Sequence, residues 1–287
     1  MNKSEKIYSI GVDVGGTKMS AVLFDGVKVI ADYTLATPKD NLEHFMIMLK
    51  ALIEPLQDKA RAAGAVIKGV GLGIPGMLDY KENKVVEVPN IPFLNGLKLP
   101  DILTSKLGVE QIKIDNDGHC FLRAEMKLGA GKKYSNVFSV TIGTDLGGGW
   151  WHNGEIYNGA HGGATEFSWL TVDFKEGISL RDAYHKLTQN NPSTLAEEAY
   201  RGDVLAQKSY NELGHYFGIS LANMVNLIDP ELIIVGGRVV ESDDLFLPQA
   251  KKIMRKYIKS PEAKVIKIVK GKLGVKAGAI GAALLIS

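Results

Sequence analysis

The chain has 287 residues, of which 45% are hydrophobic and 23% are charged, and these proportions are ordinary for a soluble globular protein. The formal net charge of +2 is too small to indicate nucleic acid or an anionic membrane as the main partner. Cys120 is the only cysteine, which excludes an intrachain disulfide and a cysteine-based zinc site.

Two segments of the chain repeat one pattern. Residues 9–17 read SIGVDVGGT and residues 141–149 read TIGTDLGGG, with Ile, Gly, Asp, Gly and Gly at matching positions. Each segment is followed by a strand-like run, a polar turn and a further strand-like run, which is typical of a β-unit with a glycine turn. Because the copies are so far apart, they predict two similar lobes rather than a solenoid of short repeats.

Helices and strands alternate along the rest of the chain. Between the two copies, the sequence predicts helices over 41–63, 100–107 and 118–128, strands over 67–73 and 111–114, and a loop rich in proline and asparagine over 75–100. After the second copy, it predicts helices over 180–187, 194–201, 204–227, 247–258 and 277–286, and strands over 231–237 and 264–270. This alternation is typical of the α/β class.

The two glycine turns suit the binding of phosphate groups. Consecutive glycines after a strand allow the backbone to approach a ligand, and the N–H groups of the turn can surround anionic oxygens. In the first copy, Thr17 adds a hydroxyl donor and Lys18 a cation, and Asp13 ends a strand where it could hold Mg²⁺ through water. An ordinary tight hairpin would use the same residues. The second copy favours the phosphate interpretation, since a nucleotide clamp needs two such turns.

These motifs, in their order and spacing, resemble those of the ROK family, which contains bacterial sugar kinases and sugar-responsive repressors within the actin-like ATPase superfamily. The resemblance covers nearly the whole chain and is carried by the segments GVDVGGTK, GLGIPGMLD, VPNIPFLNGLKL, KIDNDGHCFLRAE, GTDLGGG, IIVGGRV and AGAIGAAL. It implies ATP and Mg²⁺ as cofactors, a small-molecule sugar as substrate, and a homodimer as the family-based expectation for assembly.

The resemblance also implies a fold. It is the two-lobed actin-like ATPase (ribonuclease H-like) fold, in which each lobe is a mixed sheet flanked by helices. We expect a smaller N-terminal lobe formed by residues 1–117 and 276–287, and a larger C-terminal lobe formed by residues 118–275.

By the same resemblance, nucleotide-binding residues lie in three glycine motifs: Gly15, Gly16, Thr17 and Lys18 in the first, Gly143, Thr144, Gly147 and Gly148 in the second, and Gly236 and Gly237 in the third. The third motif corresponds to the adenosine side of the family's site.

The resemblance identifies Asp117 as the catalytic base. The chemistry agrees, because a sugar hydroxyl is a poor nucleophile and a carboxylate within hydrogen-bond reach can accept its proton during phosphoryl transfer. Asn116 would hold a neighbouring hydroxyl, and Asn90 matches the asparagine of the family's substrate loop. Asn116 and Asp117 also suit an N-cap before the helix that begins near Gly118, and this interpretation is compatible with catalysis.

Near the sugar the sequence departs from the family pattern. Glu166 aligns with the sugar-binding glutamate of the family's A-G-E-x-G-H segment, but Ser168 replaces the second glycine and Trp169 replaces the histidine. The cysteines that bind structural zinc in most members are missing, so no zinc is expected. Asp182 begins Asp-Ala-Tyr, which resembles the family's Glu-Ala-Tyr, and is a further candidate for substrate binding.

Two of the departures have open roles. The indole of Trp169 could stack against the apolar face of a sugar, or it could fill the volume that the zinc loop occupies in the family. Asp145 stands where the family usually has glycine. Its carboxylate could repel phosphates or could help to organise the metal, as we expect for Asp13.

The function expected from these features is an ATP-dependent sugar kinase that transfers the γ-phosphoryl group of ATP to a hydroxyl of a hexose or hexose derivative. The alternative is a degenerate kinase-fold protein that binds sugar or nucleotide without turnover. A repressor is not expected, because only a few residues precede the first strand. Neither a signal sequence nor a stretch of about eighteen apolar residues is present, so a cytoplasmic protein is expected.

Overall fold

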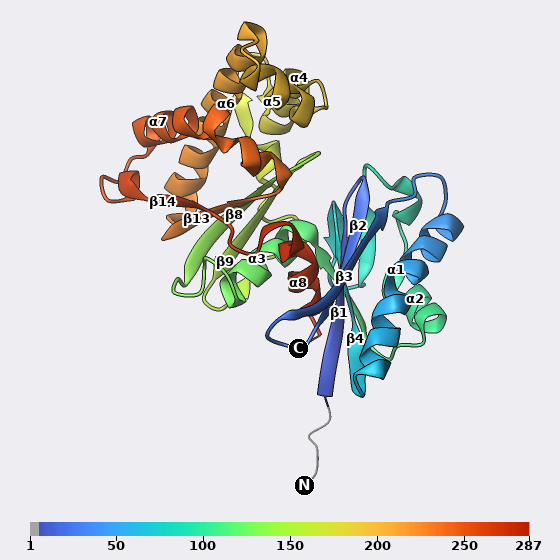
Figure 1. The fold of residues 1–287 in the computed structure, drawn as a ribbon. Coiled ribbons are helices and arrows are strands. Elements are labelled where there is room, and N and C mark those ends of the chain that lie inside the picture. The colour runs from blue at the N-terminus through green and yellow to red at the C-terminus, as the bar shows by residue number, and fades with distance from the viewer. Residues whose placement is uncertain (1–5, 287) are drawn as a thin grey trace. The chain divides into compact units, whose positions relative to one another are not determined.

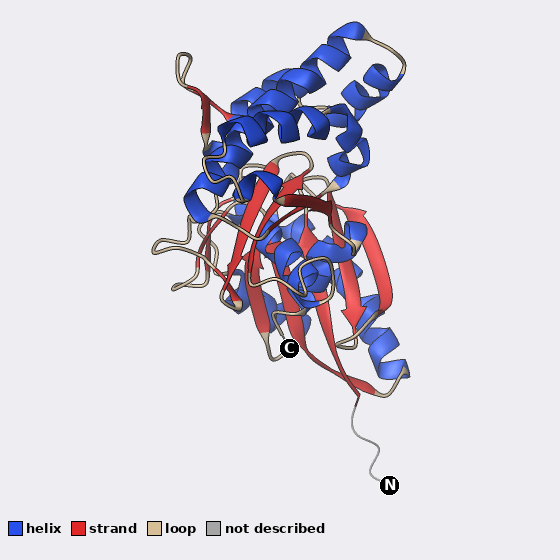
Figure 2. Ribbon diagram, turned by 90° about the vertical axis from the view of Figure 1, so that its left-hand side faces the viewer, coloured by secondary structure: helices blue, strands red, loops and turns tan. Residues whose placement is uncertain are grey.

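The computed structural model describes residues 6–286 and divides them into two compact units. The first unit contains the residues up to Gly129, the segment Asn158–Ala164 and the residues from Leu273 onward, and the second contains Ala130–Tyr157 and Thr165–Lys272. In both units strands form a mixed sheet that helices cover, which confirms the α/β class (Figure 2). Among the described residues, no helix is long and apolar enough to cross a membrane.

The sheet of the first unit has five strands in the order β3-β2-β1-β4-β7. Their bounds are β1 (Lys6–Val14), β2 (Lys18–Phe24), β3 (Val29–Ala36), β4 (Ala65–Ile74) and β7 (Ile112–Asn116). Strands β1, β2 and β3 form an antiparallel meander, while β4 runs parallel to β1 and β7 runs parallel to β4. The carboxyl ends of β1, β4 and β7 therefore meet at one edge of the sheet, which is where an open parallel sheet binds its ligands.

Helices cover both faces of this sheet. The helices α1 (Leu42–Ala62) and α2 (Leu99–Leu107) lie on one side, and α3 (Asp117–Lys127) and α8 (Ala277–Ala283) lie on the other (Figure 1). Helix α1 begins where the side chain of Asn41 accepts a hydrogen bond from the His44 N–H, a regular N-cap. Residues of β1 and α1 share one buried core, so this face is sealed by ordinary apolar packing.

Glycines let α8 approach the sheet at backbone distance. A Cβ atom on Gly11 in β1 would lie 1.9 Å from the Ala279 carbonyl oxygen, and one on Gly71 in β4 would lie 1.8 Å from the Ala282 carbonyl oxygen. On the other side of α8, a Cβ atom on Gly281 would lie 1.7 Å from the Cys120 carbonyl oxygen in α3. The small residues of the terminal motif therefore serve to pack α8 between the sheet and α3, and no larger side chain fits at these points.

The sheet of the second unit has the order β10-β9-β8-β13-β14. The bounds are β8 (Asn136–Ile142), β9 (Leu146–His152), β10 (Glu155–Ile156), β13 (Leu232–Gly236) and β14 (Lys267–Lys270). Strands β8, β9 and β10 form an antiparallel meander, and β13 runs parallel to both β8 and β14. The meander repeats that of β1, β2 and β3, so the predicted duplication of the strand–turn–strand pattern is confirmed.

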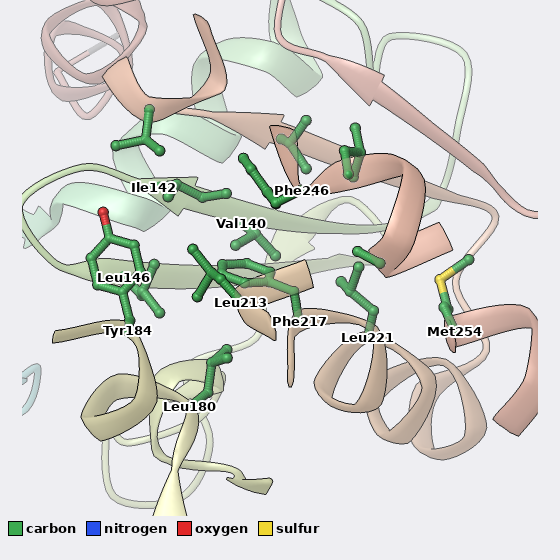
Figure 3. Packing of buried hydrophobic residues seen from close by; sticks show 14 of the residues in the cluster. Val140, Ile142, Leu146, Leu180, Tyr184, Leu213, Phe217, Leu221, Phe246 and Met254 are labelled. Atoms are coloured by element: carbon green, nitrogen blue, oxygen red, sulfur yellow. The ribbon is translucent and has the colours of Figure 1, made fainter. Parts of the chain in front are cut away.

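Four helices belong to the second unit: α4 (Leu180–Thr188), α5 (Pro192–Tyr200), α6 (Val204–Ile228) and α7 (Leu247–Tyr257). Apolar side chains of α6, such as Phe217 and Leu221, pack against Val140 of the central strand in one large core (Figure 3). Helix α6 is capped at its C-terminus by Asp229, which has a left-handed φ of 42° and is followed by a proline that cannot continue the helix.

Three local features differ from the sequence predictions. The expected loop over 75–100 contains a hairpin of β5 (Met77–Asp79) and β6 (Lys84–Glu87), and a second hairpin of β11 (Thr171–Asp173) and β12 (Ile178–Ser179) precedes α4. These strands are too short to show a clear period in sequence. The terminal helix ends at Ala283, short of the expected residue 286.

The division between the units also differs from the expected lobes. Helix α3 belongs to the first unit, although residues from 118 onward were expected in the second lobe. The reason is the packing of α3 on α8 and on β4, both of which are part of the first unit.

Candidate active site

The first glycine turn joins β1 to β2 and is closed by backbone bonds. The Gly15 N–H donates to the Lys18 carbonyl over 2.9 Å, and the Thr37 hydroxyl donates to the Gly15 carbonyl over 2.7 Å. The turn is thus a true hairpin, which leaves Thr17 and Lys18 exposed. A Cβ atom on Gly16 would lie 3.4 Å from the Asn90 side chain, so the structure brings the expected phosphate turn and the expected substrate-loop asparagine together.

Two carboxylates lie at the edge of the first sheet where β1, β4 and β7 end. Asp13 near the end of β1 is aligned with Gly73 of β4, and a Cβ atom on Gly73 would lie 3.5 Å from the Cα atom of Asp117. Burial, which is the larger cause, and the negative charge of Asp117 together raise the pKa of Asp13 to about 7. The candidate metal ligand and the candidate base therefore interact electrostatically across one strand.

Asn116 caps α3 with the oxygen of its amide and ties the cap to the loop after β4 with the nitrogen. Its Oδ1 accepts from the Gly118 N–H over 2.8 Å and from the His119 N–H over 3.3 Å, and its Nδ2 donates to the Gly76 carbonyl over 3.0 Å. The N-cap interpretation is therefore correct. One hydrogen of the Nδ2 group remains for a ligand. The cap fixes the start of α3, and with it the position from which Asp117 projects.

A buried polar network lies behind this junction, and the sequence analysis missed it. Asp115 is only 4% exposed, and its carboxylate accepts from the Tyr80 hydroxyl over 3.0 Å and from the Arg123 guanidinium. The Nδ1 atom of His119 lies 3.3 Å from the same carboxylate. Burial alone would raise the pKa of Asp115, but hydrogen bonds and charges from His119 and Arg123 lower it below its ordinary value.

The spacing of this network carries a signal that could have revealed it. His119 and Arg123 are separated by four residues within α3, and Asp115 lies four residues before His119. His119 and Arg123 therefore share one face of α3, and Asp115 ends the strand that leads directly into this helix, so the three residues predict a polar cluster at the junction of strand and helix.

The second glycine turn joins β8 to β9 and is held by α4. The Gly143 N–H donates to the Asp145 carbonyl over 3.0 Å, and the Tyr184 hydroxyl donates to the Gly143 carbonyl over 2.6 Å. Thr144 is exposed at the tip. A Cβ atom on Gly148 would lie 2.5 Å from the Thr165 carbonyl oxygen, so close packing explains this buried glycine without a ligand.

Asp145 does not present an open carboxylate. Arg181 donates to it from Nε over 2.9 Å and from Nη2 over 2.7 Å, and the His185 Nε2 lies 3.3 Å away. The Leu146 N–H donates to the same carboxylate over 2.9 Å. The expected role of Asp145 in metal binding is therefore not favoured, because an arginine already supplies the positive charge.

Gly236 and Gly237, the third glycine motif, lie beside the second. Gly236 is aligned with Thr141 of β8, and Gly237 has a φ of 88°. A Cβ atom on Gly237 would lie 2.3 Å from the Ile142 carbonyl oxygen. The two motifs that the sequence assigned to the nucleotide in this unit therefore share one edge of its sheet.

The candidate acceptor-binding residues of the second unit have different surroundings. Glu166 is exposed, and the indole of Trp169 is 59% exposed, so the interpretation of Trp169 as a packing residue is wrong. The Cζ atom of Arg181 lies over that indole, 5.6 Å from the ring centroid. Asp182 forms a capping box with Ser179 at the start of α4, and this structural role accounts for its carboxylate.

Comparison with known proteins decides the family. The sequence profile of the ROK family matches residues 9–287. The chain belongs to the ROK family. Its fold is accordingly the actin-like ATPase fold of that family, as the sequence predicted.

Several relatives of this ROK chain are named as sugar kinases. It is 27% identical to an N-acetyl-D-glucosamine kinase of Mannheimia succiniciproducens over 96% of this chain and 98% of that protein. It is 30% identical to the N-acetylgalactosamine kinase AgaK of Shewanella sp. over 84% of this chain and 86% of that protein. A xylose repressor of Caldicellulosiruptor bescii is also similar, at 24% identity over 95% of this chain and 76% of the repressor.

Solved structures of ROK family kinases are also similar to this chain. A ROK family glucokinase from Streptomyces griseus, determined in complex with glucose and AMPPNP, matches with a TM-score of 0.80 and 27% identity over 97% of this chain and 98% of that chain. A ROK hexokinase from Thermus thermophilus matches with a TM-score of 0.77 and 26% identity over 96% of this chain and 97% of that chain.

Proposed function

We propose that this ROK chain is an ATP-dependent sugar kinase, which transfers the γ-phosphoryl group of ATP to a hydroxyl group of a hexose or hexose derivative. The observation that carries the proposal is the convergence, at one sheet edge, of Asp13, Asp117 and the glycine turn that contacts Asn90. The names of the relatives support a sugar as the acceptor, and the complex of the related glucokinase supports an adenine nucleotide as the donor.

In this proposal Asp117 accepts the proton of the attacking hydroxyl group. Its position is fixed by the Asn116 cap and by the Asp115 network behind the β7–α3 junction. The spare Nδ2 hydrogen of Asn116 and the nearby Asn90 amide would orient other hydroxyls of the sugar. Positioning of this kind contributes much of the rate in phosphoryl transfer, because the protein has little covalent chemistry to perform.

Asp13 is the residue that would hold Mg²⁺ in this proposal. Burial and the charge of Asp117 raise its pKa to about 7, which means that the site lacks positive charge and that a cation would relieve the repulsion. Among the described residues there is no cluster of three or more histidine, cysteine or acidic side chains that would form a protein cage for a metal. One carboxylate fits Mg²⁺, which keeps several waters and binds phosphates. When bound, the ion would neutralise charge on the phosphates.

The glycine turns would bind phosphate oxygens through their backbone N–H groups. In the first turn Gly16 and Thr17 offer these groups, and Lys18 adds a positive charge. In the second turn the N–H groups of Thr144 and Gly147 would bind phosphate oxygens, while Gly143 closes the turn through its bond to the Asp145 carbonyl. The adjacent Gly236–Gly237 segment would pass close to the adenosine.

A second candidate is a sugar- or nucleotide-binding protein without turnover. It is motivated by the similarity to a xylose repressor and by Trp169, which stands where the family's sugar-binding histidine is expected. The presence of Asp117 together with both glycine turns favours the enzyme.

The deciding experiment measures ADP release with ATP, Mg²⁺ and a panel containing glucose, N-acetylglucosamine, N-acetylgalactosamine and other hexoses. We expect at least one sugar to stimulate release, and Asp117→Asn to reduce that stimulated rate by about a hundredfold or more. Circular dichroism would verify that the variant is folded. Stimulation that survives in Asp117→Asn would remove Asp117 from the role of base. Binding of ATP without stimulation by any sugar would favour the second candidate.

A further inference from the structure

The second glycine turn contains a carboxylate at a position where phosphates are expected to bind. Asp145 lies between Gly143 and Gly147, within the turn itself. Two unit charges of the same sign repel each other over several ångströms, and the repulsion grows where water is partly excluded. An unpaired Asp145 would therefore oppose the binding of a nucleotide at this turn.

The structure pairs this carboxylate with Arg181 in a fixed geometry. Nε of Arg181 donates to Oδ1 of Asp145 over 3.1 Å and Nη2 donates to Oδ2 over 2.7 Å, which is the forked arrangement that a guanidinium forms with a carboxylate. The side chains of Arg181 and Asp145 are 26% and 29% exposed, so water screens the pair only in part.

Two neighbours lie against the pair. The Cζ atom of Arg181 lies over the ring of Trp169, 5.6 Å from the ring centroid, and His185, one helical turn further along α4, contacts the carboxylate of Asp145. Both Arg181 and His185 belong to α4, whose capping box at Ser179 fixes the start of the helix. The pairing is thus built into the helix that also holds the turn through Tyr184.

We propose that Arg181 is a positioning residue that neutralises Asp145 and thereby makes this aspartate-containing turn able to bind phosphate groups. The Asp145–Arg181 pair would leave the turn without net negative charge, as a glycine at this position does. The inference rests on the proposed binding of a nucleotide at this turn and adds the residue on which that binding depends.

The test is a double-mutant cycle on the binding of AMPPNP with Mg²⁺, measured by calorimetry on the full chain. Arg181→Met should weaken binding by about tenfold or more, because it leaves a carboxylate unpaired next to the phosphates. Asp145→Gly should bind at least as tightly as the wild-type chain. The double variant Asp145→Gly/Arg181→Met should recover to within about threefold of Asp145→Gly, since no carboxylate remains to be neutralised.

Two further measurements separate charge from structure. The deficit of Arg181→Met should shrink as salt is added, because salt screens a repulsion but does not repair a misfolded turn. Arg181→Lys, which keeps the charge and loses the fork, should lie between wild type and Arg181→Met. Arg201→Met is the matched control, because Arg201 forms an exposed pair with Glu197 elsewhere in the same unit. This variant should bind AMPPNP as tightly as the wild-type chain does.

A double variant as weak as Arg181→Met would overturn the inference, as would an Arg181→Met variant that binds like the wild type. Either result, together with sugar-stimulated ADP release by the wild-type chain, would leave the kinase proposal intact. Absence of AMPPNP binding to the wild-type chain would overturn both the role of Arg181 and the kinase proposal.

Discussion

The carboxylate of Asp13 lies against Gly278 in the first turn of α8, so closely that a Cβ atom on Gly278 would come within 2.5 Å of the Asp13 Oδ2. Gly278→Ala should therefore displace Asp13 and lower the rate of sugar-stimulated ADP release by about tenfold or more. The overpacking should also cost about 1–3 kcal/mol in the free energy of unfolding. Activity assays and urea titration would check both effects, and a variant with wild-type rate and stability would contradict the contact.

The raised pKa of Asp13 predicts a pH dependence of stability in the metal-free protein. The carboxyl group has an ordinary pKa of 3.8, and burial and the charge of Asp117 raise the pKa to about 7 in the folded chain. Between these values the folded state keeps a proton that the unfolded state has lost, so the contribution of Asp13 to stability falls as pH rises through this window and is constant above it.

Asp13→Asn should remove this dependence. With EDTA present, the free energy of unfolding of the variant should equal that of the wild type near pH 4. Above pH 7 it should be larger by an amount on the order of 2 kcal/mol, after allowance for partial exposure of the carboxylate. Urea titrations at several pH values would measure the difference. A constant difference across the range would show that Asp13 does not titrate in this window.

The buried network predicts a cost for removing its central charge. Asp115→Asn should lower the free energy of unfolding by about 3 kcal/mol, because Arg123 would be left without its buried partner. The matched control is Asp58→Asn, since the Asp58–Arg61 pair is exposed and should contribute less than about 0.5 kcal/mol. Equal effects of the two substitutions would argue against the network as a determinant of stability.

The exposed indole predicts an effect that is larger on the acceptor than on the nucleotide. Trp169→Ala should raise the KM for the sugar by about five- to tenfold, as expected for the loss of one stacking contact. The KM for ATP should rise less, because Arg181 loses its contact with the ring but keeps its pair with Asp145, and the thermal stability should change little. Trp169→Phe should retain part of the affinity. Phe174→Ala is the control, because Phe174 is 85% exposed on the β11–β12 hairpin and has no proposed role. A larger rise in the KM for ATP than in the KM for the sugar would show that the ring acts mainly through Arg181 instead.

The sequence predicted the parts of this molecule whose determinants are local. The repeated glycine motif predicted both meanders, and the Asn116–Asp117 pair predicted the cap at the start of α3. The Asp145–Arg181 pair joins residues 36 positions apart, and nothing in either segment alone indicates the other. The expected first lobe stops at residue 117 while the compact unit continues to Gly129, and the reason for this difference is related: α3 packs on α8, which is distant in sequence.

The glycine contacts of α8 have a consequence for the order in which the chain acquires its structure during translation. All five strands of the first sheet are synthesised before residue 117, but α8 leaves the ribosome only after the entire second unit has been made. Until then, the close-fitting surface around Gly11 and Gly71 has no helix to cover it. The nascent first unit would therefore remain incomplete while the second unit folds, and a transient partner such as a chaperone would find its binding surface on that uncovered face.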